Sequence, residues 1–389
     1  MVTDVDVLIL GGGCAGLSLA WRLAELGANC PSVLILEKRN TYVNDRTWCF
    51  WDDNDTRMAG LLAQQWRWLK VGGLSRTVSF DCGRSAYQML AASSFYDRAL
   101  RVIHDCPSII QAQGQAVGGE PVRGPDGWTA ASSLGNIKAQ RVIDTRPSVL
   151  PATGGATLWQ SFYGHEVCCD ADVFTPEAAQ LMDFTAGVHG QIPFTYVLPI
   201  TARHALIEAT VFGPEPLGQD ALAAQLDAAV QQHTAGASFD IVRSESGILP
   251  MGLTHRPTSL GAGHVAVGVM AGGARASSGF AFQRIQQWAD QCAAAMAAGR
   301  APTAHRADPP LVRMMDQLFL RVLRDAPHVA PDLFLSLFER ADPASVIRFL
   351  SGKGSVRDCL NVVTALPAKV FVRQLLLSSP TWRVQGAGG

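Results

Sequence analysis

A glycine-rich turn between two apolar segments constrains the fold of this chain more than any other feature. The apolar run at residues 7–10 leads into a G-x-G-x-x-G pattern, and apolar residues then recur at helical spacing. The three glycines of the pattern are Gly11, Gly13 and Gly16. A strand, turn and helix of this kind brings backbone N–H groups and a helix N-terminus close to a pyrophosphate. The segment therefore predicts a dinucleotide site.

A second apolar run at residues 33–36 ends in Glu37. A carboxylate at this point is placed to accept hydrogen bonds from the ribose of the dinucleotide. The alternative is a glycine-rich turn that only packs a helix on a strand. Because the fingerprint lies within a few residues of Met1, we interpret the cofactor as FAD held permanently rather than an exchanging nicotinamide.

The composition is apolar for an enzyme, with 48% hydrophobic and 17% charged residues in 389. It indicates an apolar substrate, contact with a membrane surface, or both. The alternative is an alanine-rich, tightly packed soluble protein. The net charge of −1 gives no support to nucleic-acid binding. No apolar run reaches the roughly 18 residues of a spanning helix, and the first residues lack the basic region of a signal peptide. We expect a cytoplasmic chain.

The nine cysteines are scattered and form no C-x-x-C pair. We interpret them as reduced thiols that pack as small hydrophobic side chains, not as a disulfide framework or a metal site.

Two further segments are candidates for cofactor contact. Residues 44–51 bring charged and large aromatic side chains together. We expect Arg46 and its neighbours to contact the flavin side of the site and the aromatic side chains to line a cavity. The alternative is a loop stapled by an Arg–Asp pair over the edge of the core. Asp144 and Arg146 end a predicted buried strand, where α/β sheets place ligand contacts. For Arg146, an internal ion pair is an equal alternative.

The middle third of the chain reads as adjacent antiparallel strands of a separate sheet. Asp183 and Glu208 are single carboxylates within apolar strands, and such groups are rarely buried without a partner or a task. Burial raises the pKa of a carboxyl group, which keeps a proton available for donation near neutral pH. An exposed position on the outer face of the sheet is the alternative for Glu208.

The last third is predicted to be mainly helical. A turn containing Gly268, Gly272 and Gly273 precedes a helix over residues 281–298 and suits a flavin. Residues 301–310 form a predicted linker. Short helices bounded by proline and glycine follow at residues 311–323, 331–340, 343–350, 355–365 and 368–377. An earlier amphipathic helix is predicted over residues 87–100.

Taken together, these motifs resemble the flavin-dependent lycopene cyclases of carotenoid pathways. The resemblance runs in order over nearly the whole chain. It includes the N-terminal fingerprint, Asn44-Asp45-Arg46-Thr47-Trp48, Tyr87, Asp144-x-Arg146, Leu181-Met182-Asp183-Phe184, Phe194-x-Tyr196-x-Leu198-Pro199, Leu206-Ile207-Glu208-Ala209-Thr210 and Glu245-Ser246-Gly247-Ile248-Leu249-Pro250-Met251. The segment with Arg275, Ser277, Ser278 and Phe280 departs from the family pattern, and these residues are candidates to face the cavity.

The resemblance implies an isomerase that closes the ends of a linear carotenoid such as lycopene into β-ionone rings without net oxidation. It implies reduced FAD as cofactor and NAD(P)H as reductant. Glu208 matches the essential acid of the family, with Asp183 as a supporting carboxylate and Glu245 as a weaker third candidate. Aromatic side chains, among them Trp48, Phe50, Trp51, Phe194 and Tyr196, are expected to shield the cation. A flavin monooxygenase and a carotenoid-binding flavoprotein are the alternatives.

The predicted fold is α/β: a glutathione-reductase-like Rossmann domain that binds FAD, interleaved with an antiparallel substrate sheet and followed by a helical region. The FAD-binding domain is expected over residues 1–75, 95–160 and 255–300, the substrate domain over 76–94 and 161–254, and the helices over 301–389. Because lycopene dissolves only in membranes, we expect peripheral association with the inner face of the cell membrane. Phe334, Leu335, Leu337, Phe338, Phe349 and Leu350 are candidates for that contact, with core packing as the alternative.

Overall fold

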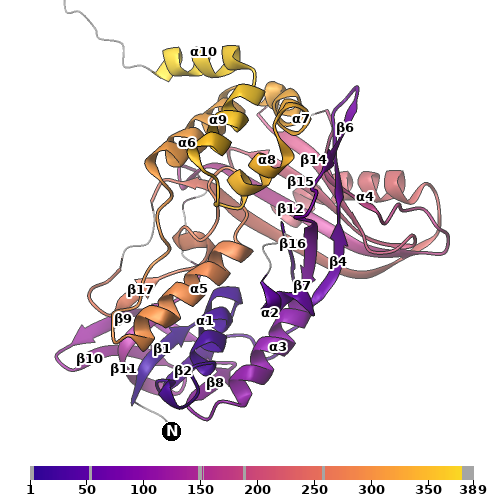
Figure 1. The fold of residues 1–389 in the computed structure, drawn as a ribbon. Coiled ribbons are helices and arrows are strands. Elements are labelled where there is room, and N and C mark those ends of the chain that lie inside the picture. Colours follow the sequence, from indigo (N-terminus) through magenta and orange to yellow (C-terminus); the bar gives the residue numbers. More distant parts are fainter. Residues whose placement is uncertain are drawn as a thin grey trace, which may run out of the picture.

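The molecule has two lobes, each built around a seven-stranded sheet, and a layer of helices lies over the second lobe (Figure 1). The structure is a computed structural model that describes residues 4–51, 55–147, 151, 153–186, 190–255 and 259–378. The predicted helical region at residues 301–389 therefore extends, at residues 379–389, outside the described residues.

The first sheet has seven strands, of which five are parallel, and it confirms the predicted dinucleotide-binding fold. Its order is β8-β2-β1-β11-β10-β9, with β17 beside β11. The bounds are β1 (Asp4–Leu10), β2 (Val33–Glu37), β8 (Ile109–Gln113), β9 (Val117–Gly124), β10 (Gly127–Ser132), β11 (Gly135–Asp144) and β17 (His264–Ala266). Three helices pack on one face: α1 (Cys14–Ala24), α3 (Ala92–His104) and α5 (Phe282–Ala297). The central strands β1 and β2 carry continuous buried apolar runs at residues 7–10 and 33–36, as expected where a sheet is covered on both faces.

The second sheet is almost entirely antiparallel and supplies the long strands of the upper lobe. Its order is β16-β12-β15-β14-β13-β5-β6. The bounds are β5 (Trp68–Gly72), β6 (Thr77–Asp81), β12 (Ala156–Cys169), β13 (Ala178–Phe184), β14 (Ile192–Pro199), β15 (His204–Gly213) and β16 (Phe239–Leu253). A small sheet of β3 (Thr47–Trp51), β7 (Tyr87–Ala91) and β4 (Leu62–Trp66) joins the two lobes.

The period-two alternation of β15 divides the second sheet into two different faces. Ala205, Ile207 and Ala209 pack with α4 (Gln219–Thr234), which covers the outer face (Figure 1). Leu206 and Glu208 point to the opposite face, which lines a cavity. The local sequence thus determines which carboxylates face that cavity.

In the part of the chain that the structure describes, the helical layer consists of five helices, as predicted. They are α6 (Pro310–Asp325), α7 (Ala330–Arg340), α8 (Pro343–Leu350), α9 (Val356–Ala365) and α10 (Ala368–Ser378). Among the described helices, none is long and apolar enough by itself to cross a membrane. The pair at residues 356–365 and 368–376, bent by 98°, passes the length and composition criteria as a unit.

The smaller elements are α2 (Thr56–Ala59) and three single turns of 3-10 helix. These turns are η1 (Gly27–Asn29), η2 (Val269–Ala271) and η3 (Pro327–Val329). Of these, η2 lies within the predicted glycine-rich turn, directly after Gly268.

Some sequence-based boundaries were wrong. The segment predicted as one helix over residues 87–100 is strand β7 followed by α3, because its first apolar residues pair with β3 and β4. The strand at residues 68–72, assigned to the first domain, pairs with β13 and β6 in the second sheet. Likewise, β12 enters the second sheet from Ala156, before the predicted boundary at residue 160.

Candidate functional site

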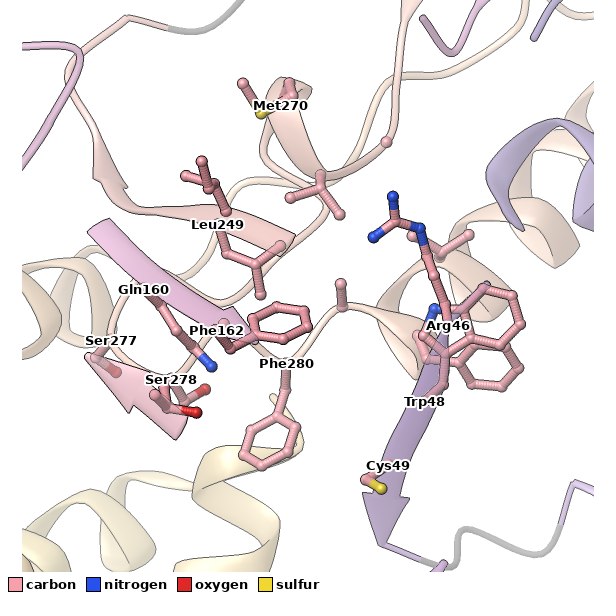
Figure 2. Close-up of a pocket in the computed structure, with 18 of the residues that line it drawn as sticks. Arg46, Trp48, Cys49, Gln160, Phe162, Leu249, Met270, Ser277, Ser278 and Phe280 are labelled. Carbon is pink, nitrogen blue, oxygen red and sulfur yellow. The ribbon is translucent and has the colours of Figure 1, made fainter. Parts of the chain in front are cut away.

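One cavity of about 1140 Å³ extends from the glycine fingerprint, between the two sheets, to the helical layer. Gly11 and Glu37 line one end, and Phe371 and Leu375 of α10 line the other. Figure 2 shows Arg46, Trp48 and Cys49 on one side, opposite Gln160, Phe162 and Leu249 from β12 and β16. The cavity is long enough to connect a cofactor end with an apolar end.

The cofactor end has the geometry that a dinucleotide requires. A Cβ atom on Gly16 would lie 2.1 Å from the carbonyl oxygen of Gly11, so only glycine allows this close approach of helix and turn. Glu37 Oε2 accepts a hydrogen bond of 2.6 Å from the Gly12 N–H. Burial opposes the charge of Glu37, but hydrogen bonds from Arg39 and Gly12 hold its pKa below the ordinary value. An ionised acceptor thus stands where a ribose is expected.

The structure does not bring all predicted cofactor residues to the cavity. Gly11, Gly13, Glu37, Arg46 and Gly268 line it. Gly16 lies behind them, buried in the first turn of α1.

Asp144, Gly272 and Gly273 are not among the lining residues. Asp144 forms an ion pair of 2.7 Å with Arg146, as the alternative interpretation proposed, and Arg146 itself lines the cavity. Gly272 and Gly273 form the turn that follows η2, where Gly273 packs against His305. We assign these three residues to the shape of the site and not to direct contact.

Glu208 lies in the middle of the cavity wall and is only 7% exposed. The strand register places Glu208 opposite Gly164 of β12, and Gly164 opposite Glu245 of β16. A Cβ atom on Gly164 would lie 2.6 Å from Glu208 Cγ. Because glycine has no side chain, Gly164 leaves the space in which the two carboxyl groups meet.

Glu208 and Glu245 form a hydrogen-bonded carboxyl pair. Burial, the charge of Glu245 and the hydrogen bond from Glu208 to it raise the pKa of Glu208 well above its ordinary value, and Arg243 acts in the opposite direction. Glu245 Oε2 accepts a hydrogen bond of 2.7 Å from Thr47 Oγ1 and forms an ion pair with Arg243. The two carboxyl groups thus differ: Thr47 and Arg243 hold Glu245, whereas burial beside Glu245 favours the protonated form of Glu208.

Aromatic side chains surround this carboxyl pair. Tyr196 lies opposite Glu208 in the neighbouring strand, and its hydroxyl is 2.9 Å from that of Tyr87. Trp48 and Phe194 also line the cavity, as predicted.

Phe50 and Trp51 do not line the cavity, contrary to the prediction. They are 5% and 1% exposed, and Phe50 stacks on Phe282 within the core of the first lobe. The candidates Leu335, Leu337, Phe338 and Phe349 for membrane contact are buried in the core of the helical layer, so core packing is correct for them.

Asp183 lies outside the cavity wall, and its proposed role as a supporting carboxylate is not compatible with this position. Its pairing partner is Thr195, which precedes Tyr196 and so faces the opposite side of the sheet. Burial raises the pKa of Asp183, and the imidazole of His233 on α4 acts in the opposite direction. The sequence could not separate the two faces for Asp183 because β13 carries a bulge just before it.

Sequence reasoning missed Arg243, Glu166 and Gly164, which surround the carboxyl pair. Arg243 Nε donates to Glu166, and Arg243 Nη2 donates to Thr47 Oγ1 at 2.7 Å. A signal was present for Arg243, because it precedes Glu245 by two residues and so shares its face of the strand. No comparable signal identified Glu166 on a distant strand.

The segment that departs from the family pattern has two different roles. Ser277, Ser278 and Phe280 line the cavity (Figure 2). Arg275 does not line it but is 1% exposed, with two hydrogen bonds of 3.0 Å to Asp316 of α6. Arg275 therefore fastens the glycine-rich turn to the helical layer.

Fold comparison shows that the chain shares its architecture with solved structures that include a flavin-dependent enzyme. It superposes on a geranylgeranyl bacteriochlorophyll reductase-like protein from Thermoplasma acidophilum with a TM-score of 0.61 and 13% identity, covering 96% of this chain and 99% of the other. For the flavin-dependent brominase Bmp2 the values are 0.62 and 13%, with the same coverage. These likenesses establish the fold alone and agree with the predicted glutathione-reductase-like class.

Within this class, the chain belongs to the lycopene cyclase family, whose sequence pattern matches residues 6–376. It is 32% identical over 256 residues to the lycopene beta-cyclase of Paracoccus sp. (strain N81106 / MBIC 01143). That alignment covers 62% of this chain and spans slightly less than two thirds of the relative, 65%. The resemblance expected from the motifs is thus confirmed.

Proposed function

We propose that this protein is a lycopene cyclase that converts the acyclic ends of lycopene, or of a related linear carotenoid, into β-ionone rings. The observation that carries the proposal is the carboxyl pair of Glu208 and Glu245 in the wall of an apolar cavity. A carboxyl group held protonated by burial is the donor that acid catalysis needs near neutral pH. Family membership and the cyclase name of the Paracoccus relative support the same reaction.

The proposed cycle conserves protons and electrons. Glu208 donates its proton to the terminal double bond of the polyene, which leaves a tertiary carbocation and a carboxylate. The neighbouring double bond then attacks the cation and closes the ring. Loss of a ring proton to the carboxyl pair forms the new double bond and restores the acid. The aromatic walls at Trp48, Phe194 and Tyr196 exclude water and stabilise the cation by cation–π contact.

The proposed cofactor is FAD, which Gly11, Gly13, Glu37, Arg46 and Gly268 would hold at the cofactor end of the cavity. Reduced FAD supplies negative charge that stabilises developing positive charge electrostatically. NAD(P)H is the proposed source of its electrons. A yellow protein that releases FAD on denaturation is the expected observation, and a colourless protein with no bound flavin would contradict this assignment.

Expression in cells that accumulate lycopene tests the reaction directly. We expect a cyclic product with the mass of the substrate, separated by chromatography. A product that has gained oxygen would instead identify a flavin monooxygenase, and unchanged lycopene with bound flavin would identify a carotenoid-binding flavoprotein.

We also propose that α9 and α10 rest on the inner face of the cell membrane and that the polyene reaches the cavity there. Val363, Val372 and Leu375 are 49–53% exposed and at the same time line the cavity, so they border its opening. Leu360 and Leu376 extend this apolar surface. Exposed basic side chains flank it and suit anionic lipids: Arg313, Arg357, Lys369 and Arg373.

Liposome flotation tests the membrane proposal. Wild-type protein should float with vesicles that contain anionic lipid, and the double variant Leu360→Asp/Leu376→Asp should remain in the aqueous fraction. Val122→Asp is the matched control, since Val122 is 68% exposed on β9, in the other lobe. Wild-type protein that stays in the aqueous fraction would contradict the proposal.

A further inference from the structure

Arg243 lies at the centre of a buried chain of charged groups that ends at the proposed acid. Its Nη1 donates to Glu245, its Nε donates to Glu166, and its Nη2 donates to Thr47 at 2.7 Å. Beyond Glu166, His204 Nε2 lies 2.7 Å from Glu166 Oε1 at the more exposed end of the chain. The guanidinium group therefore has a fixed orientation set by three partners from three different strands.

The cluster contains more carboxylates than cations, and this imbalance bears on where the proton of the carboxyl pair lies. Glu166 and Glu245 are two carboxylates, and Arg243 is the cation between them, with a side chain only 12% exposed. Because one cation serves two anions, it cannot also neutralise Glu208, which has no ion pair of its own among the described residues. The proton of the carboxyl pair is thereby directed to Glu208, because Arg243 is engaged with Glu245 and Glu166.

We propose that Arg243 is a positioning residue, which fixes Glu245 as an ionised acceptor and so keeps the catalytic proton on Glu208. The inference rests on the proposed cyclase function. Once Glu208 has donated its proton, the carboxyl pair carries two negative charges, and the nearby guanidinium stabilises them electrostatically. Arg243 thus acts on the acid both before and after the proton leaves.

The phenol and thiol groups near the carboxyl pair are neutral near neutral pH. Burial raises the pKa of Tyr87 and Tyr196 well above the ordinary value, and burial likewise raises that of Cys49. The groups that face the pair from the elements packed around it are Cys49 of β3, Tyr87 of β7, Glu166 of β12, Tyr196 of β14, His204 of β15 and Arg243 of β16. Within this set, Arg243 is the cation that lowers the pKa of Glu208.

Infrared spectroscopy of the flavin-loaded protein provides a test that does not depend on turnover. Protonated carboxyl groups give a C=O band that shifts in heavy water. We expect one such buried group in the wild type, absent in Glu208→Gln. Arg243→Gln should show a second one at the same pH, because two adjacent carboxyl groups then lack a counter-charge. The second band should disappear again in the double variant Arg243→Gln/Glu245→Gln.

The pH–rate profile is the second readout. In Arg243→Gln both limbs should move to higher pH and maximal turnover should fall by about 100-fold, since small displacements of reacting groups have effects of that size. Arg243→Lys keeps the charge but cannot contact three partners, so it should recover part of the turnover. Arg284→Gln is the control, because Arg284 forms a similarly buried ion pair of 2.8 Å with Asp308, away from the carboxyl pair.

Two outcomes separate the possible failures. If Arg243→Gln lowers thermal stability but leaves both the carboxyl bands and the pH limbs unchanged, Arg243 has a structural role only and the inference is overturned. If the wild type has no cyclase activity while the infrared bands change as described, the proposed function fails and the assignment of the proton to Glu208 stands.

Discussion

Asp183 and Glu208 lie on opposite faces of the same antiparallel sheet. Glu208 points into the cavity beside Glu245, whereas Asp183 lies on the face that α4 covers, near His233. Two carboxylates that look equivalent in their apolar strands therefore have different surroundings. Their substitution should accordingly have different effects on turnover.

Glu208→Gln should retain fold and flavin but lose at least 10²–10⁴-fold in turnover, the typical contribution of a general acid. Asp183→Asn is the matched control and should change turnover little, because its side chain is not part of the cavity wall. Product formation per flavin measures both. Near-native turnover in Glu208→Gln would transfer the role of the proton donor to another group.

The stability of the wild type should depend on pH through Glu208. The pKa of Glu208 is raised above its ordinary value of 4.5, so above that value the unfolded chain loses a proton that the native protein keeps. Stability should therefore decrease as pH rises, by at most about 1.4 kcal/mol per pH unit, until the native carboxyl also ionises. Chemical denaturation of wild type and Glu208→Gln should show a difference that grows with pH over this window.

Gly164→Ala should impair the acid without unfolding the protein. The added methyl group would lie 2.6 Å from Glu208 Cγ and 3.0 Å from the Ile207 carbonyl oxygen. Overpacking of this kind costs about 1–3 kcal/mol, and the displaced carboxyl group should lose much of its activity. Gly213→Ala in the same sheet is the control, because its nearest contact would be an ordinary 3.5 Å. Equal activity of the two variants would show that Gly164 is not needed for the carboxyl geometry.

Gly13→Asp should abolish flavin binding. It would place a carboxylate against the negatively charged pyrophosphate at the N-terminus of α1. Gly13→Ala is the control, since its Cβ would have 4.0 Å of clearance from Arg39. The flavin absorbance of the purified proteins measures the result, and full occupancy in Gly13→Asp would refute the assignment of the fingerprint.

Arg275→Met should destabilise the protein by about 3–5 kcal/mol, because Asp316 would remain buried without its cation. Thermal unfolding measures the change. In the double variant Arg275→Met/Asp316→Leu much of this loss should be recovered, since no unpaired charge remains. Little loss in the single variant would show that water reaches Asp316.

The sequence predicted best those features that depend on local pattern. The glycine fingerprint with its following helix, Glu37 at the end of β2 and the five C-terminal helices are all encoded within short segments. The strand at residues 87–91 was mistaken for helix because its apolar run fits either periodicity, and only pairing with β3 and β4 decides it.

Contacts between distant segments were beyond the reach of pattern analysis. Arg243 meets Thr47 across 196 positions of the chain and Glu166 across 77. Glu245 was recognised only as a weak candidate because its proposed role depends on contact with Glu208, which lies on a strand two positions away in the sheet. The face of the sheet on which Asp183 lies also depends on a bulge that the neighbouring residues do not predict.

The hydrogen bond between Thr47 and Glu245 joins the strand that links the lobes to the sheet that carries the acid. The proton donor is consequently a product of assembly. In a chain whose lobes have not docked, Glu245 lacks one of its partners and Glu208 lacks the wall that shields it from water. Under the proposed mechanism, a carbocation would therefore form only after the lobes have docked, where water cannot capture it before the ring closes.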